Sequence, residues 1–485
     1  MANGQATLDL TDIQGNILRG YTRQRFARFM PFRILGAQAG RDFLTELLPL
    51  ITPGEWGPGN RPEMTTNIAI TFPGFCALEL PGECLATFPA EFQEGMRARA
   101  KSLGDTNGSA PDQWDAPWNG ERVHFLVMVY GVNAATRLQR CNQITSIVQG
   151  INGAGKTAIA SLPHQDAQSL MIDGTLTRKE HFGFVDGISN PDVEGVPDNG
   201  QRDDIGNPDD NGKFRKIPAG EFVLGHPGEG GEVAPMPLPR LLGRNGSYLV
   251  VRKLEQHVEK FREFIARESA GLHKVPAGTD PEHFLAAKMM GRWQDGSPLI
   301  GHPDAPGSQP ENGFGYSNDL AGAVCPLGAH VRRANPRDSL GFGGKVMSRH
   351  RLIRRGIAYG TYLHDPKGHK LPGGQPEPHA LAPDEPTDRR GIMFLAYNSG
   401  FDQFEFVQQT WINFGDDFQQ GNDMDPITGS SDEGRMMIQG DESKGRRPFL
   451  CSGIPRFVTT KGGDYFFVPS LTGLRLMASG RVIVS

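Results

Sequence analysis

The sequence has few cysteines, little excess of charge of either sign and no long apolar run. Its five cysteines are far apart and form no Cys-x-x-Cys pair, so neither a disulfide framework nor a zinc knuckle is indicated. Fifty Lys and Arg residues against 55 Asp and Glu give a net charge of −5, which disfavours nucleic acid as a partner. No apolar run approaches the ~18 residues of a membrane helix, and Asp9 and Asp12 interrupt the segment where a signal peptide needs an apolar core. We therefore expect a cytoplasmic protein with no nucleic-acid or membrane partner.

Glycine and proline, in contrast, are abundant. The 485 residues include 63 Gly and 37 Pro, about a fifth of the chain where roughly an eighth is usual. This excess excludes long coiled coils and helical solenoids, and it lacks the three-residue period of collagen. With 37% hydrophobic and 22% charged residues, the composition is that of a loop-rich globular protein. Because a chain of this length exceeds the size of a single core, we expect two domains.

Strand and helix patterns alternate in both halves of the chain. In the first half, residues 32–35, 67–72 and 124–131 are predicted strands, and 41–51 and 134–150 are predicted helices. A polar stretch at 197–220 precedes a similar order. In this second half, a strand begins at 247 and runs into a helix that carries Leu254 and Val258 on one face. Further strands are predicted at 392–398 and 464–470, with a helix at 401–414. We predict an α+β fold of two ferredoxin-like domains with antiparallel sheets and peripheral helices, spanning residues 1–215 and 216–485.

Residues 150–157 (GINGAGKT) match the phosphate-loop pattern GxxxxGK[ST]. That loop works between a strand and a long helix, whose N-terminus meets the phosphates. Here the preceding residues have helical spacing and Pro163 follows closely. We favour a glycine turn at the end of a helix, and a phosphate-loop NTPase is a remote alternative.

Two further strings carry candidate site residues. In GFVDGISNP (183–191), Asp186 stands between glycines and can project into a cavity, although such a residue also caps turns. In CPLGAHVRRANPR (325–337), one His precedes several arginines, as an axial ligand beside the anionic carboxylates of a haem would require. A loop His among solvated arginines is the alternative. No His-x-x-x-His or paired-Cys spacing accompanies it, so a zinc site is a poor interpretation.

Two strand-like strings follow, HRLIRRGIAYG (350–360) and RGIMFLAYN (390–398). Ile392 and Phe394 share one face of the second strand, while Met393 and Leu395 share the other. We expect that one of these faces either lines a cofactor cavity or packs in an ordinary hydrophobic core.

Taken together and in order, these strings resemble the dye-decolorizing peroxidases, a haem enzyme family. The likeness covers most of the chain, from TDIQGNILRGY (11–21) through AAKMMGRWQDGSPL (286–299) to DPITG (425–429). It is nearest to the longer-chain class. The resemblance implies a fold of the dimeric α+β barrel type and one haem b per chain, held mainly by the second domain. It also implies hydrogen peroxide as oxidant and bulky aromatic donors such as dyes and phenols. A haem-binding or haem-iron-releasing protein without strong peroxidase activity is the alternative.

Carried over by motif, His330 would be the axial iron ligand, backed by the carboxylate of Asp425, with Glu405 as the competing partner. Asp186 would be the distal acid–base group, and Arg354 would stabilise negative charge during O–O cleavage. Ile392 and Phe394 would line a narrow apolar distal pocket. The residues that would bind the cofactor's carboxylates are Arg332, Arg333 and Asn190.

Two consequences follow from this assignment. An aspartate base predicts an acidic optimum for dye oxidation, since Asp side chains usually titrate near ~3.9 and His near ~6.5. Bulky donors do not fit a narrow pocket, so electrons are expected at the haem edge or through the aromatic residues Tyr359, Tyr362 and Trp411. Ordinary packing is the alternative for these three, and the physiological donor and the oligomeric state stay open.

Overall fold

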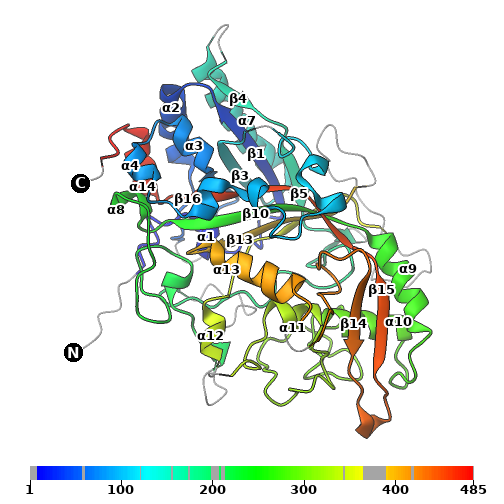
Figure 1. Cartoon of the computed structure of the whole chain (residues 1–485). Helices are drawn as coiled ribbons and strands as arrows, with labels where there is room; N and C mark the ends of the chain where they lie inside the picture. Colours follow the sequence, from blue (N-terminus) through cyan, green and yellow to red (C-terminus); the bar gives the residue numbers. More distant parts are fainter. Residues whose placement is uncertain are drawn as a thin grey trace.

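The computed structural model describes residues 8–56, 61–120, 122–153, 157–172, 175–197, 207–208, 214–341, 344–363, 389–416 and 420–483. A ten-stranded sheet crosses the molecule (Figure 1), with the main order β11-β13-β10-β16-β2-β3-β1-β4 and with β12 and β5 paired beside it. Most of the segment 365–390, which is rich in Pro, Gly and Asp, lies outside the described residues.

The N-terminal half has the order β-α-β-β-α-β. Its β3 is buried at every position and lies between β2 and β1, as its apolar sequence FLVMVYG requires. The sheet order β4-β1-β3-β2 is that of a ferredoxin-like unit. The elements are β1 (Phe26–Ile34), α2 (Ala37–Leu47), β2 (Met64–Ile70), β3 (Phe125–Gly131), α7 (Ala134–Asn152) and β4 (Ile159–Ser161).

The C-terminal half repeats this order, with β16-β10-β13-β11 in the sheet. The two halves meet where Phe467 of β16 pairs with Ile70 of β2. The predicted α+β fold with antiparallel sheets is therefore confirmed, whereas the boundary between residues 215 and 216 stays a prediction. The elements are β10 (Ser247–Gln256), α9 (Val258–Ser269), β11 (Ile353–Arg354), β12 (Ile357–Tyr359), β13 (Gly391–Asn398), α13 (Phe401–Phe406) and β16 (Val458–Val468).

Two predicted elements of this half differ from the structure. The strand β10 continues to Gln256 and α9 begins at Val258, so Leu254 lies on the strand rather than on the helix. The helix predicted at 401–414 is α-helical only to Phe406 and continues as a π-helix over Val407–Asn413. π-Helical turns often occur at functional sites. Their carbonyl groups depart from the regular hydrogen-bond pattern of an α-helix and need other partners.

A second hydrophobic core lies outside the sheet, on the side of α9 and α10 (Pro281–Met290) (Figure 1). Aromatic rings of Phe261, Phe264 and Phe457 pack there, together with the hairpin β14 (Gly434–Ile438) and β15 (Phe449–Ile454). Ala329 belongs to this core and immediately precedes the short helix α11 (His330–Ala334). The core thereby fixes the start of the helix that carries His330.

The favoured interpretation of residues 150–157, a glycine turn at the end of a helix, is confirmed, and the phosphate-loop alternative is wrong. The helix α7 extends to Asn152 and ends at Gly153, where φ is +59°, and the element that follows is the strand β4. A helix before and a strand after is the reverse of the order that places backbone N–H groups at a phosphate. Residues 154–156 lie outside the described residues.

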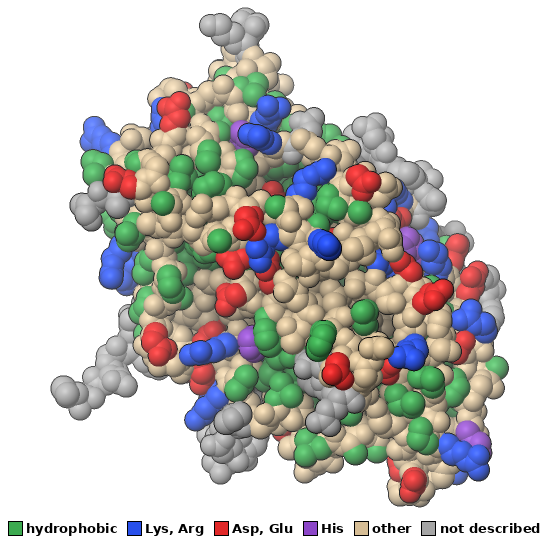
Figure 2. All heavy atoms as spheres, in the orientation of Figure 1, with side chains coloured by type: hydrophobic (Ala, Val, Ile, Leu, Met, Phe, Trp, Pro, Cys, Tyr) green, Lys and Arg blue, Asp and Glu red, His purple; other side chains and the backbone are tan. Residues whose placement is uncertain are grey.

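Acidic and basic side chains are interspersed over the visible face of the molecule (Figure 2). Among the described residues, no helix is both long and apolar enough to cross a membrane.

Candidate active site

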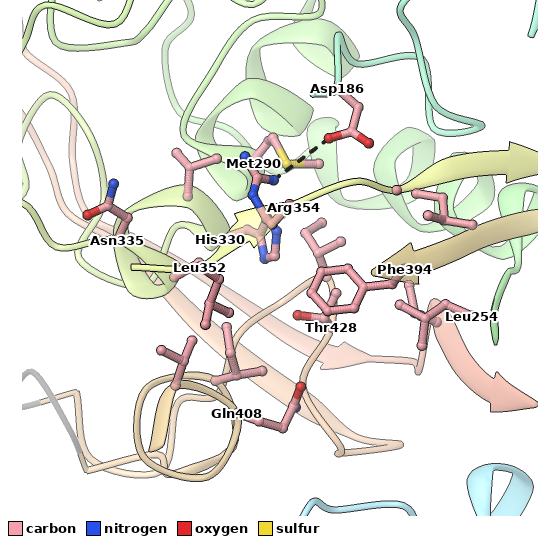
Figure 3. Close-up of a pocket in the computed structure, with 18 of the residues that line it drawn as sticks. Asp186, Leu254, Met290, His330, Asn335, Leu352, Arg354, Phe394, Gln408 and Thr428 are labelled. Atoms are coloured by element: carbon pink, nitrogen blue, oxygen red, sulfur yellow. Dashed lines mark ion pairs between the residues drawn. The ribbon is translucent and has the colours of Figure 1, made fainter. Parts of the chain in front are cut away.

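A cavity of about 350 Å³ lies against one face of β10 and β13 (Figure 3), a size within the usual range of ligand sites. Its wall combines apolar and charged side chains. The apolar wall includes Leu254, Met290, Leu352, Ile392, Phe394, Val407 and Ile412, and the charged groups include Glu180, Asp186, Arg292, His330, Arg337, Arg351 and Arg354.

Asp186 projects from a turn whose backbone requires glycine. Gly187, directly after it, has φ of +72°, a backbone angle that residues other than glycine rarely adopt. The Asp186 amide donates to the carbonyl of Arg178 at 2.7 Å, so the turn is anchored on its N-terminal side. The carboxylate, 38% exposed, faces the Arg354 guanidinium at 3.8 Å (Figure 3).

Arg354 is held at three points on the other side of this pair. Its backbone N–H donates to Oδ1 of Asn190 at 2.9 Å, and its Nη2 donates to the carbonyl of Ile188 at 2.7 Å. Its strand β11 pairs with β13, with Arg354 opposite Ala396. The loop that carries the carboxylate and the strand that carries the guanidinium therefore fix each other.

The predicted division of β13 into two faces is observed. Ile392 and Phe394 line the cavity, and the ring of Phe394 points into it in Figure 3. Met393 and Leu395 are 1% and 0% exposed in the core on the opposite face.

His330 also lines the cavity and is backed by a carboxylate. Its Nδ1 lies 2.9 Å from Oδ2 of Asp425, a fully buried side chain, while a quarter of the His330 surface is open towards the cavity. The other carboxylate oxygen accepts the backbone N–H groups of Ile427 and Thr428 at 2.9 and 2.7 Å. Glu405, the competing partner, is bound instead by Arg99 and by the Tyr465 hydroxyl. The structure therefore pairs His330 with Asp425.

This pairing shifts the pKa of both groups. Burial lowers the pKa of His330, but the charge and hydrogen bond of Asp425 outweigh burial, so the pKa is raised. Burial raises the pKa of Asp425, but His330 and the Thr428 N–H outweigh it, so the pKa is lowered. Nδ1 therefore donates to the carboxylate, which leaves Nε2 as the nitrogen for a ligand.

Three predicted cofactor-binding residues do not line the cavity. Arg332 donates to Asp319 and to the carbonyl of Cys325, and it stacks on Tyr316. Arg333 donates to the carbonyls of Trp411 and Phe414 at the end of the π-helix. The Asn190 side chain is used by the Arg354 backbone. The described polar contacts of all three residues are made to neighbouring chain segments, so the assignment of Arg332, Arg333 and Asn190 to a bound cofactor stays a prediction that this cavity does not favour.

Two buried arginines that line the cavity were not predicted. Arg292 donates to the carbonyls of Gly296 and Glu311, and Arg337 to those of Asn312 and Phe314. Burial lowers the pKa of both guanidinium groups, and their mutual repulsion lowers that of Arg292 further, to about 10. Both lie in strings singled out in the sequence, at 286–299 and 325–337, but only the fold shows which arginines face inward.

Two residues other than glycine have strained backbone conformations at this end of the cavity. Ser189 and Arg337 have φ of +63° and +54°, and Arg337 Nη2 donates to the Ser189 hydroxyl at 3.1 Å. Strained residues of this kind cluster at functional sites, where surrounding contacts hold them.

The three aromatic residues considered as entry points for electrons are buried. Tyr359, Tyr362 and Trp411 are 1%, 3% and 3% exposed. Packing therefore explains all three, and none of them forms a surface contact point in this fold.

Similarity to known proteins decides the family. A family model described as the DyP dimeric alpha+beta barrel domain matches residues 12–157. A dye-decolorizing peroxidase of Mycena epipterygia is 30% identical over 512 residues, covering 97% of this chain and 87% of the relative. The chain belongs to the dye-decolorizing peroxidase family. The multifunctional dye peroxidase DyP2 of Amycolatopsis sp. (strain ATCC 39116 / 75iv2) is 29% identical, covering 98% of this chain and 97% of the relative.

Solved structures agree with this membership. An ancestral D-type dye decolorizing peroxidase superimposes with a TM-score of 0.77 at 28% identity, covering 97% of this peroxidase and 99% of that chain. A dye-decolorizing peroxidase in complex with 2,6-dimethoxyphenol gives 0.76 at 27% identity, covering 97% and 100%. Among the described residues of this family member, no group of three or more His, Cys, Asp or Glu side chains is arranged to hold a metal ion.

Proposed function

We propose that this protein is a haem-dependent peroxidase that reduces hydrogen peroxide and oxidises bulky aromatic donors such as dyes and phenols. The observation that carries the proposal is that two pairs of side chains contribute to one cavity. Asp186 and Arg354 form the first pair, and His330, backed by Asp425, belongs to the second. The first pair offers acid–base chemistry beside a fixed positive charge, and the second offers an oriented nitrogen ligand.

The residues of the cavity fit one haem b. A haem needs one axial ligand, an apolar wall and partners for two carboxylates. Nε2 of His330 would hold the iron, and Ile392 and Phe394 would contact the ring. The buried guanidinium groups of Arg292 and Arg337, whose described hydrogen bonds go to neutral oxygens, would hold the carboxylates. An anion there would relieve the repulsion that lowers the Arg292 pKa.

When bound, haem supplies the iron at which peroxide is reduced and the redox capacity that aromatic donors then use. The Asp186 carboxylate accepts a proton from peroxide and returns it to the outer oxygen, which leaves as water. The Arg354 guanidinium orients peroxide and stabilises the negative charge that develops as the O–O bond breaks. Asp425 keeps the proton of His330 on Nδ1, which strengthens Nε2 as a donor.

A haem-binding or haem-iron-releasing protein is the second candidate, because it would need His330 but not Asp186. Stopped-flow mixing of the haem-loaded protein with peroxide, comparing wild type with Asp186→Asn, separates the two. Peroxidase function predicts a loss of about 10²- to 10⁴-fold in the rate of reaction with peroxide. Unchanged reaction in the variant would contradict the proposed role of Asp186. A protein that acquires no visible Soret absorption on reconstitution would contradict both candidates. We also retain a cytoplasmic location as part of the proposal.

A further inference from the structure

The carboxylate of Glu180 is bound by three neutral donors at the edge of the cavity. Oε1 accepts the backbone N–H of Phe184 at 2.9 Å, and Oε2 accepts the backbone N–H of Phe182 at 2.9 Å. Oε2 also accepts Nε2 of Gln256 at 2.6 Å. The residue is 8% exposed and lines the cavity, yet the acid–base step proposed above does not use it.

These bonds close the turn that leads directly to Asp186. The Glu180 N–H donates to the carbonyl of Phe184, and the Gly183 N–H donates back to the carbonyl of Glu180, both at 2.9 Å. Gly183 has φ of +97°, which lets the chain reverse within this turn. Lys179 then pairs with Val185 in an antiparallel bridge. The reversed chain thus delivers Asp186 to the cavity two residues after the last N–H that Glu180 binds.

The same carboxylate ties the turn to the sheet. Gln256 is the last residue of β10 and pairs with Val458 of β16. The Phe182 ring packs 4.6 Å from that of Phe261 on α9. A second polar contact joins the turn to the sheet, because Nε2 of His181 lies 2.8 Å from the carbonyl oxygen of Tyr359 on β12. The Glu180–Gln256 bond is the contact that joins the turn to β10.

We propose that Glu180 is a positioning residue for Asp186: its carboxylate closes the Glu180–Phe184 turn and ties it to Gln256, and so holds the Asp186 carboxyl in register with Arg354. This proposal rests on the proposed function, since Asp186 is the group being positioned. Glu180 itself contacts neither peroxide nor donor in it.

A carboxylate suits this position because both of its oxygens accept. The two backbone N–H groups point at different oxygens, so the amide of a glutamine would place its NH₂ group against one of them. Glu180→Gln therefore leaves one buried N–H unsatisfied although it preserves size and shape. The variant separates the hydrogen-bonding role from simple packing.

The test measures loop order and the peroxide step separately in Glu180→Gln, at pH 8, where the Glu180 carboxylate of the wild type is ionised because its pKa is about 7. Hydrogen–deuterium exchange of residues 178–190 is expected to accelerate about 10-fold or more in the variant, with or without haem. The second-order rate constant of the haem-loaded variant with peroxide is expected to fall about 10- to 100-fold, because a displacement near 1 Å is enough for such a loss. The rate at which a phenolic donor is oxidised after the peroxide step should stay unchanged.

Asp464→Ala is the control. Asp464 is a half-buried carboxylate whose Oδ1 accepts two backbone N–H groups, from Met96 and Tyr465, but it does not line the cavity. It should lower the melting temperature without changing the peroxide rate. If Glu180→Gln does not fold, Gln256→Leu removes the side-chain bond between β10 and Glu180 and should show the same two effects in smaller size.

The outcomes are distinguishable. Wild-type exchange and wild-type peroxide kinetics in Glu180→Gln would overturn the positioning role. An equal loss of peroxide rate in Asp464→Ala would also overturn it, since general destabilisation would then explain the effect. If Asp186→Asn reacts with peroxide as wild type does, the proposed function fails, whatever Glu180 does to the turn.

Discussion

Nδ1 of His330 lies 2.9 Å from Oδ2 of Asp425, across 95 residues of sequence. This contact fixes the imidazole on the short helix α11 and leaves its Nε2 side open to the cavity. Partners of this kind orient a metal-binding histidine and raise its basicity.

Replacing Asp425 by Asn is therefore expected to weaken haem retention about 10- to 100-fold. The measurement is transfer of haem from the protein to an excess of a haem-scavenging globin, followed by absorbance. Glu405→Gln is the control, because Glu405 is engaged with Arg99 and Tyr465 rather than with His330. Equal losses in the two variants would contradict the assignment of Asp425.

Arg354→Leu should slow the reaction with peroxide about 10²- to 10³-fold, because it removes the positive charge that faces the reacting oxygens. Haem content should be unchanged, as the wall of Ile392 and Phe394 stays in place. Stopped-flow kinetics with peroxide measures the effect. Arg349→Leu is the control, since Arg349 is 62% exposed and pairs with the exposed Glu232.

Replacing an arginine that lines the cavity and replacing one that does not are expected to have different effects. Arg337→Gln should weaken haem retention, because Arg337 faces the cavity and has no role in the pair at His330. Arg332→Gln should instead lower the free energy of unfolding by about 3–5 kcal/mol, because it leaves the buried Asp319 carboxylate without its guanidinium partner. Haem titration and urea unfolding of the haem-free proteins measure the two effects. Loss of haem in Arg332→Gln without loss of stability would instead support Arg332 as a cofactor-binding residue.

The difference between these arginines shows which part of the site local sequence patterns cannot predict. The strings around Asp186, His330, Arg354 and Ile392 could be found because each has a local pattern. Arg332 follows His330 by two positions, so on a helix it points about 200° away. Arg333 is diverted by the carbonyls of a π-helix, an element that local periodicity reads as an ordinary helix. Which charges face inward therefore depends on tertiary packing.

The same limit applies to Glu180. Its neighbours gave no pattern of acid–base chemistry, and its role depends on Gln256, 76 residues away at the end of β10. The fold class, in contrast, was predictable, because strand and helix periodicities follow directly from which faces are buried.

Glu180 should give the protein a measurable dependence of stability on pH. Burial raises its pKa to about 7, the Asp186 charge adds to this, and the bonds from Phe182, Gln256 and Phe184 oppose it. In the unfolded chain a glutamate titrates near ~4.3, so between these values the folded chain binds more protons. The free energy of unfolding should therefore fall as pH rises from about 4.5 to 7, by at most about 3 kcal/mol. Urea unfolding of the haem-free protein across this range measures the slope, which should flatten in Glu180→Gln.

Dye oxidation should be fastest in acid. The cavity places an aspartate, rather than a histidine, beside Arg354, and aspartates as a class stay ionised at pH values where histidines are protonated. An aspartate base therefore remains able to accept the peroxide proton well below neutral pH. Initial rates with a dye between pH 3 and 8, with the Soret absorption recorded at each point, measure the profile. A maximum near pH 8 and no activity at pH 4, with haem still bound, would contradict Asp186 as the proton acceptor.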